Sequence, residues 1–436
     1  MKKVAFYTLG CKVNQYETEA MIEMFEKDGY EQVGSEDYAD VYVINTCTVT
    51  HMSDRKSRQY IRRMKKKNPD AIIAVVGCYS QVSPEEILEI EEVNLGMGTN
   101  ERRTIVEEIK KLEEQENEKK ASTVDDIMKV RAFEEIEISQ SNGKTRAFMK
   151  IQDGCDRFCT YCIIPYARGG KVRSRDMESI VNEAKTLAEN GYEEVVLTGI
   201  HVASYGKDIK DENVTLLDVI KQINEIDGIK RIRTSSVEPI LFTDEFVEEI
   251  SKMEKVMPHY HLSLQSGCDE TLKRMNRRYT TAEYKEIVDK LRKAMPNVAI
   301  TTDVIVGFPG ESEEEFNETY NFLKEIELMH MHIFKYSPRK GTKAAEMKNQ
   351  ISPQIKHERS EKLLQLNKEN FEKFASKMVG KEFDVLFEQK VGENKYEGLT
   401  PNYLKTFVTS DEDLSGKILK VKITEVKDEY VEGLLV

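Results

Sequence analysis

The chain has 436 residues, of which 39% are hydrophobic and 33% charged, and its formal net charge is −13 at pH 7. This length predicts two or three domains, and the composition is that of an ordinary soluble protein. No apolar run approaches the roughly 20 residues of a membrane-spanning helix, so a membrane protein is excluded and a cytoplasmic one is expected. The seven cysteines, an odd number, argue against a disulfide framework and favour metal or redox chemistry.

The first part of the chain alternates apolar runs with amphipathic segments. Residues 2–10, 40–46 and 71–77 predict buried strands, and residues 14–27, 52–67 and 101–112 predict helices. Such alternation is typical of a doubly wound α/β domain with a parallel sheet. Residues 113–126 are almost free of apolar side chains and predict a helix end followed by a linker. We therefore expect an N-terminal α/β domain over residues 1–125.

The middle of the chain repeats a strand–helix unit six times. The predicted strands are residues 146–152, 193–200, 232–237, 260–265, 299–307 and 330–337, and helices are predicted over 176–190, 243–255 and 281–294. Six units fall short of the eight of a closed TIM barrel. The pattern therefore predicts an open (βα)6 partial barrel over residues 141–372, with its site at the carboxyl ends of the strands.

The last part begins after a long predicted helix, residues 354–377. From residue 382 onward, short alternating segments are separated by turns that contain Gly and Asn. This pattern predicts a small antiparallel β-barrel of the OB type over residues 373–436.

Three cysteines follow the first barrel strand with the spacing C-x3-C-x2-C: Cys155, Cys159 and Cys162. Structural zinc normally takes four ligands from two clusters, and the next cysteine, Cys268, lies far along the chain and is expected to be structural. The polar residues of this loop also disfavour a buried structural trio. A cubane iron–sulfur cluster needs one thiolate for each iron, so three thiolates would leave one iron open for a ligand. We therefore predict a [4Fe–4S] cluster here.

Three further cysteines each follow a predicted strand of the N-terminal domain: Cys11, Cys47 and Cys78. A single cysteine in a sheet is usually a small buried hydrophobic residue. The carboxyl ends of parallel strands, however, meet at one edge of the sheet, where α/β domains bind ligands. Three cysteines at that edge predict a second three-thiolate cluster, again with one open iron.

The stretch "GCDRFCTYC", residues 154–162, resembles the signature of radical S-adenosylmethionine (SAM) enzymes. In that family the open iron chelates the methionine part of SAM, and the aromatic residue before the third cysteine, here Tyr161, lies near the adenine. With the second cysteine triad and the terminal barrel, nearly the whole chain resembles the methylthiotransferases, which combine a methylthiotransferase domain, a radical SAM domain and a TRAM domain. Residues 9–19 and 151–175 are similar to members that act on tRNA N6-threonylcarbamoyladenosine.

This resemblance implies an enzyme that converts C2 of N6-threonylcarbamoyladenosine, next to the anticodon, into its 2-methylthio form. It also implies two [4Fe–4S] clusters, SAM as both methyl donor and radical source, and a reductant such as flavodoxin or ferredoxin. C2 cannot usefully be deprotonated by a side chain, so no acid–base pair is expected. The substrate alternatives are isopentenyladenosine in tRNA and a ribosomal-protein aspartate. An iron–sulfur RNA-binding protein without catalysis is disfavoured.

Residues at the other strand ends are expected to line the SAM pocket, although each alone is more often a turn or rim residue: Thr198, Gly199, Glu238, Gln265, Asp303 and Gly307. His201 is expected to be a rim histidine.

Although the net charge is negative, RNA responds to local potential, and two basic stretches predict contacts with the tRNA anticodon loop. The first is the loop after the barrel cysteines, with Arg168, Lys171, Arg173 and Arg175. The second is the run 55–67, which has eight basic residues, including Arg58 and Arg62, and no acidic one. The terminal barrel is a third candidate, because it mixes charged and aromatic side chains.

Overall fold

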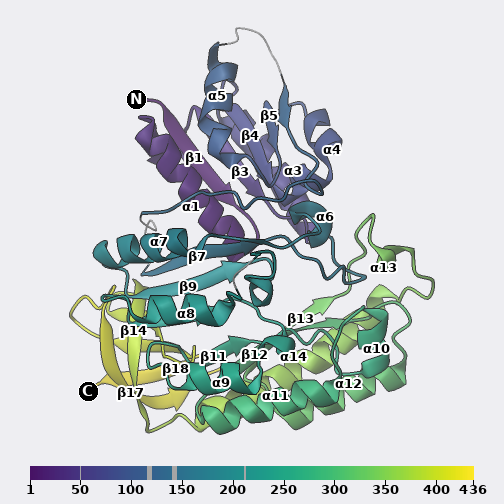
Figure 1. The fold of residues 1–436 in the computed structure, drawn as a ribbon, viewed down its shortest axis with the longest axis vertical. Helices are drawn as coiled ribbons and strands as arrows, with labels where there is room; N and C mark the ends of the chain where they lie inside the picture. The colour runs from purple at the N-terminus through teal and green to yellow at the C-terminus, as the bar shows by residue number, and fades with distance from the viewer. Residues whose placement is uncertain (50, 115–119, 140–144, 211–212) are drawn as a thin grey trace.

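A computed structural model describes residues 1–49, 51–114, 120–139, 145–210 and 213–436. Figure 1 shows the N-terminal unit at the top, the central unit below it and the C-terminal barrel at the lower left. Among the described residues, no helix is both long and apolar enough to cross a membrane.

The N-terminal unit is built on a six-stranded parallel sheet in the order β2-β1-β3-β4-β5-β6. Its central strands are rich in Val and Ile and almost wholly buried, as is typical of a parallel sheet that is covered on both faces. The strands are β1 (Lys3–Thr8), β2 (Glu31–Val33), β3 (Val41–Thr46), β4 (Ile72–Gly77), β5 (Leu95–Met97) and β6 (Ala121–Thr123). The helices are α1 (Lys12–Lys27), α2 (His51–Lys67), α3 (Cys78–Val82), α4 (Pro84–Glu89), η1 (Arg102–Thr104) and α5 (Ile105–Glu114).

The predicted linker over residues 113–126 is wrong in part. Residues 121–123 form β6, the edge strand of the N-terminal sheet, because their backbone pairs with β5 although their side chains supply little apolar surface. Residues 115–119 lie outside the described residues.

The central unit is the predicted open barrel. The strands β7, β9 and β10 form one parallel set and β11, β12 and β13 another, and an isolated parallel bridge between Val237 and Leu262 joins the two sets. The strands are β7 (Arg146–Asp153), β8 (Arg173–Ser174), β9 (Glu194–Gly199), β10 (Arg231–Thr234), β11 (His259–His261), β12 (Ala299–Val306) and β13 (His330–Lys335). The helices are α6 (Ile164–Arg168), α7 (Met177–Glu189), η2 (Val202–Ser204), α8 (Leu216–Asn224), η3 (Pro239–Leu241), α9 (Asp244–Ser251), α10 (Asp269–Arg274), α11 (Thr281–Ala294), α12 (Glu313–Ile326), α13 (Lys343–Glu346) and α14 (Pro353–Ser376).

The C-terminal unit is a closed five-stranded barrel in the order β14-β15-β16-β18-β17. Its strands are β14 (Glu382–Lys390), β15 (Lys395–Leu399), β16 (Lys405–Thr409), β17 (Ile418–Val426) and β18 (Val431–Leu435). The barrel is not wholly antiparallel as expected, because β16 and β18 pair in parallel to close it. Two β10 arginines hold the barrel to the central unit, since Arg231 donates to Leu399 O at 3.1 Å and Arg233 to Thr400 O at 3.0 Å.

Candidate active site

The loop after β7 brings the first three cysteines together. It turns at Gly154, whose φ is +74° and where an added Cβ would lie 1.9 Å from the carbonyl oxygen of Lys171. Within the loop, Cys162 N donates to Cys159 O at 2.9 Å. Burial, together with the neighbouring Cys159 thiol, raises the pKa of Cys155 to about 12. Grouped, buried thiols of this kind become thiolates readily only beside a cation, so the donor set fits an iron cluster.

The second triad lies at the carboxyl ends of β1, β3 and β4. An added Cβ at Gly10, where φ is +112°, would lie 3.2 Å from Cys47 Sγ, so the β1 turn passes directly over this thiol. Asn14 fixes the turn by donating through Nδ2 to Leu9 O and Thr46 O at 2.8 and 2.9 Å. Burial and the Cys78 thiol raise the pKa of Cys47 to about 12. The donor set again fits a cluster, and all six cysteines are free thiols. Their role as cluster ligands stays a prediction.

Arg168 connects the two triads. It ends the short helix after Cys162, and its Nε donates to Cys78 Sγ at 3.4 Å. Its Nη2 donates to Asn14 Oδ1 at 2.6 Å and to Glu17 Oε2 at 2.9 Å, both on α1. The loop that carries the first triad therefore closes onto the second one.

Three of the residues predicted to contact tRNA in this loop have guanidinium groups that are buried in ion pairs and do not face solvent. Arg168 is 0% exposed. Arg173 pairs with Asp153 at 3.5 Å, and Arg175 pairs with Glu183 of α7. Of the four basic residues predicted here, only Lys171 is exposed.

The other two predicted tRNA contacts lie on α2. Arg62 is 68% exposed and lies 4.0 Å from a carboxylate oxygen of Glu92, a loose pair. Arg58 is half-buried and is shared between Glu86 and the hydroxyl of Tyr79. The helix therefore presents basic side chains to solvent, as RNA contact requires, and Arg62 is the freer of the two.

Glu238 lies beside the first triad in a polar cluster that sequence reasoning did not find. Its carboxylate contacts Arg157 at 2.9 Å, His201 at 3.0 Å and Arg277 at 3.2 Å. Although burial opposes ionisation, the His201 hydrogen bond and the two arginines lower the pKa of Glu238 to about 2. Arg277 in turn donates to Cys159 Sγ at 3.2 Å. Glu238 thus orients a cation that stabilises thiolate at Cys159. No local pattern marks Arg277, because it lies 118 residues from Cys159.

The remaining predicted SAM contacts lie around the carboxyl ends of the strands. Tyr161 packs against the cluster of Phe308 and Tyr336. Other positions are set by the backbone: an added Cβ at Gly199 would lie 2.9 Å from Gln152 O, and Gln265 and Gly307 have φ values of +74° and +69°. Thr198 is buried in β9. Contact of these residues with SAM stays a prediction.

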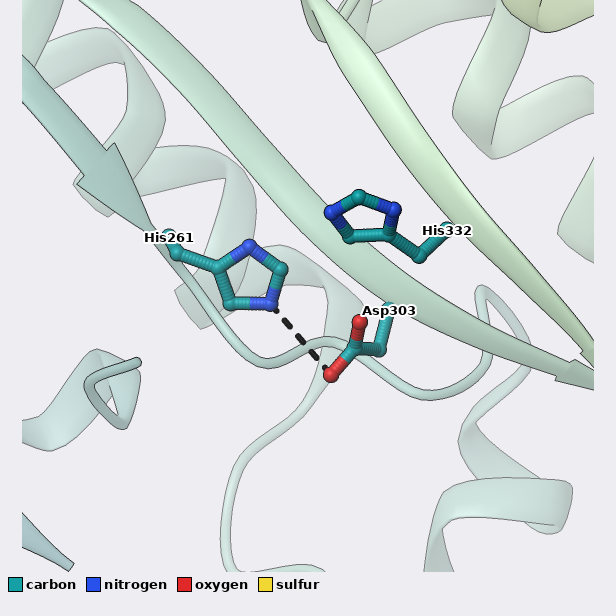
Figure 2. A group of neighbouring side chains, drawn as sticks. All are labelled: His261, Asp303 and His332. Carbon is teal, nitrogen blue, oxygen red and sulfur yellow. Dashed lines mark ion pairs between the residues drawn. The ribbon is translucent and has the colours of Figure 1, made fainter. Parts of the chain in front are cut away.

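Asp303 belongs to a group on three neighbouring strands, with His261 of β11 and His332 of β13. Figure 2 shows the three side chains turned toward one another. His261 Nε2 lies 3.3 Å from Asp303 Oδ2, and one ligand atom from each residue lies within 4.8 Å of the others. Two imidazoles and a carboxylate are a donor set that transition metals accept.

Three family models match consecutive parts of the chain. They are the uncharacterized protein family UPF0004 over residues 3–98, the radical SAM superfamily over residues 149–323 and the TRAM domain over residues 376–436. Among solved structures, the radical SAM methyltransferase TsrM from Kitasatospora setae has the same fold, with a TM-score of 0.55 and 14% identity over 78% of this chain and 74% of that one.

Curated proteins match over almost the full length. The chain is 46% identical to the threonylcarbamoyladenosine tRNA methylthiotransferase MtaB of Bacillus subtilis, over 100% of this chain and 97% of that protein. It is 43% identical to the protein of the same name from Aquifex aeolicus, over 97% of this chain and 100% of that protein. It is 39% identical to the tRNA-2-methylthio-N(6)-dimethylallyladenosine synthase of Thermoanaerobacter pseudethanolicus, over 98% and 92%. The chain belongs to the radical SAM tRNA methylthiotransferase family.

Proposed function

We propose that this enzyme transfers a methylthio group to C2 of N6-threonylcarbamoyladenosine in tRNA. The relatives named for this substrate from Bacillus subtilis and Aquifex aeolicus are 46% and 43% identical to the chain. Relatives named for the dimethylallyl substrate reach 39%. That second substrate class is the alternative.

The observation that carries the proposal is the hydrogen bond from Arg168 to Cys78 Sγ, 3.4 Å long. Arg168 lies six positions after Cys162 in the sequence. One loop therefore reaches from the triad of Cys155, Cys159 and Cys162 to that of Cys11, Cys47 and Cys78. Transfer of sulfur to a carbon that must first be activated requires both functions to reach one base, and adjacent triads meet that requirement.

The radical SAM match implies a [4Fe–4S] cluster and SAM as cofactors. We assign the first cluster to Cys155, Cys159 and Cys162, and a second to Cys11, Cys47 and Cys78. When bound, these groups supply the carbon-centred radical and the methylated sulfur.

The chain's own residues hold and orient this chemistry. Arg277 and Arg168 donate to Cys159 and Cys78, which favours the thiolate forms. Buried ion pairs fix both arginines, so these positive charges do not move away when a cluster changes its charge. Tyr161 and the strand-end residues Thr198, Gly199, Gln265 and Gly307 are proposed to enclose SAM.

For tRNA, we propose contacts from the exposed basic face of α2, including Arg62, and from Lys171. The TRAM match suggests that the C-terminal barrel contributes to RNA binding. An electron donor of the flavodoxin or ferredoxin type completes the set of partners.

Two cysteine variants test the division of labour. We expect anaerobically reconstituted protein to hold about eight irons, corresponding to two [4Fe–4S] clusters. Cys155→Ala should abolish SAM cleavage, whereas Cys47→Ala should still cleave SAM but form no methylthio product. Methylthio transfer by the Cys155 variant, or zinc in place of iron, contradicts the assignment.

The substrate is tested separately by nucleoside mass spectrometry of tRNA from a deletion strain. We expect loss of 2-methylthio-N6-threonylcarbamoyladenosine and its return when the gene is restored. Loss of the methylthio group from isopentenyladenosine instead would favour the alternative substrate.

A further inference from the structure

A cation-rich site lies between the start of α1, strands β7 and β10 and the C-terminal barrel, next to a cysteine of the second triad. Lys12 directly follows Cys11, and its ammonium lies within electrostatic range of Arg146, Arg233 and Tyr403. It is also close enough to influence His332. These residues come from the start of α1, from strands of the barrel and from the C-terminal barrel, so all three units of the chain meet at this point.

The two arginines are already held by protein groups. Arg233 pairs with Glu194 at 2.8 Å, and Arg146 pairs with Glu388 at 2.6 Å and donates to the hydroxyl of Tyr403 at 3.3 Å. Lys12 differs, because its ammonium has no hydrogen bond or ion pair with any residue that the structure describes. It is therefore the one cation of this group left to meet a ligand.

The aromatic residue Tyr403 forms a wall of the same site. Its ring stacks on His259 at 4.2 Å with an interplanar angle of 8°, and the guanidinium of Arg233 lies 5.0 Å from its centroid. Burial opposes ionisation of its hydroxyl, yet the neighbouring Arg146 and Lys12 lower its pKa. This wall is polar, whereas a pocket for an alkyl group would be lined by apolar side chains.

The unpaired charge of Lys12 favours an anion over a metal at this site. The arginines beside it already pair with carboxylates, whereas no carboxylate pairs with Lys12 among the described residues. A divalent ion on His261, Asp303 and His332 would add positive charge near this ammonium in a poorly solvated region. One carboxylate of a ligand would instead pair with it.

Building on the proposed function, we propose that this site receives the carboxylate-bearing substituent of the modified adenine. Lys12 binds the carboxylate, and the group of His261, Asp303 and His332 offers hydrogen-bond donors and acceptors to the rest of the substituent. The position next to Cys11 is apt, because the N6 substituent must lie near the base whose C2 is methylthiolated. A substituent made only of hydrocarbon would leave Lys12 buried without a counter-charge.

The test uses reconstituted holoenzyme and two anticodon stem-loop RNAs, one with the free threonylcarbamoyl acid and one with its neutral methyl ester. Wild type should prefer the acid over the ester in kcat/KM by about 10- to 100-fold, the usual effect of one charge-assisted hydrogen bond. Lys12→Met should reduce this preference to about onefold, and Lys12→Arg should restore most of it. Iron content and the electron paramagnetic resonance spectrum of each variant verify that both clusters are present.

Each outcome decides a separate question. An unchanged preference for the acid in Lys12→Met, with both clusters intact, refutes the carboxylate site alone. Failure of wild type to use either RNA refutes the proposed substrate and the site with it. Zinc or cobalt bound in equal amount to the chain, and lost in Asp303→Asn, overturns the anion assignment in favour of a metal.

Discussion

The Glu17 carboxylate on α1 is the centre of a buried charge cluster. It is 0% exposed and contacts Lys150 Nζ at 2.8 Å, Arg168 Nη2 at 2.9 Å and Arg102 Nη2 at 3.1 Å. Burial opposes its ionisation, but these cations lower its pKa from 4.5 to about 2. At about 1.36 kcal/mol for each pH unit, this shift corresponds to about 3 kcal/mol of stability at neutral pH. Removing one partner of a buried ion pair costs about 3–5 kcal/mol, which agrees.

We therefore expect Glu17→Gln to lower the free energy of unfolding by about 3 kcal/mol, seen as a lower urea midpoint by circular dichroism. The control is Glu26→Gln, an exposed position on the same helix, which should change stability by less than about 0.5 kcal/mol.

The same substitution predicts a pH dependence. Because the folded-state pKa of Glu17 lies below its unfolded value, the stabilisation is complete above about pH 4.5 and is lost as the pH falls toward 2. The difference in free energy of unfolding between Glu17→Gln and Glu26→Gln should thus be constant from neutral pH down to about pH 5 and become smaller below it. Equal midpoints for the two variants at pH 7 refute the electrostatic reasoning.

Three further variants test other parts of the structure. Gly10→Ala should bind about half the iron of wild type, because the added Cβ would lie 2.9 Å from Cys47 Cβ. The control Gly380→Ala, whose added Cβ meets nothing within 4 Å, should keep full iron content. Equal iron content in both variants contradicts the packing argument. Arg62→Glu should reduce the salt dependence of tRNA affinity by about one ion, and Lys285→Glu on α11 should not; equal slopes remove α2 from the interface. Arg231→Met should speed hydrogen exchange in residues 382–409, which its guanidinium holds through backbone carbonyls, and leave residues 41–77 unchanged; unaltered exchange shows that other contacts dock the barrel.

In the N-terminal unit, the long strands could be predicted from the sequence, and the short ones could not. The strands β1, β3 and β4 have six residues each, most of them apolar, so the position of their carboxyl ends and the meeting of their cysteines at one edge follow from the sequence pattern. The strands β2, β5 and β6 have three residues each, too few to show a period. They form because their backbone groups pair with a neighbouring strand of the sheet.

The basic loop after the first triad shows a different limit. Its arginines are three of the largest fully buried side chains, although residues 168–175 contain no carboxylate. The partner of Arg168, Glu17, lies 151 residues earlier in the chain. Composition within a window reports charge, but whether that charge faces solvent depends on what the fold brings to it.

The placement of Glu17 has a consequence for how the molecule is assembled. The helix α1 belongs to the N-terminal sheet by sequence, yet its buried carboxylate finds Lys150 and Arg168 only after 133 and 151 further residues have been made. During synthesis, until β7 and the loop after it are made, Arg102 is the only one of the three cations that can pair with this acid. A chimera that joins this unit from one relative to the barrel of another would therefore need basic residues at the positions of Lys150 and Arg168 in the barrel.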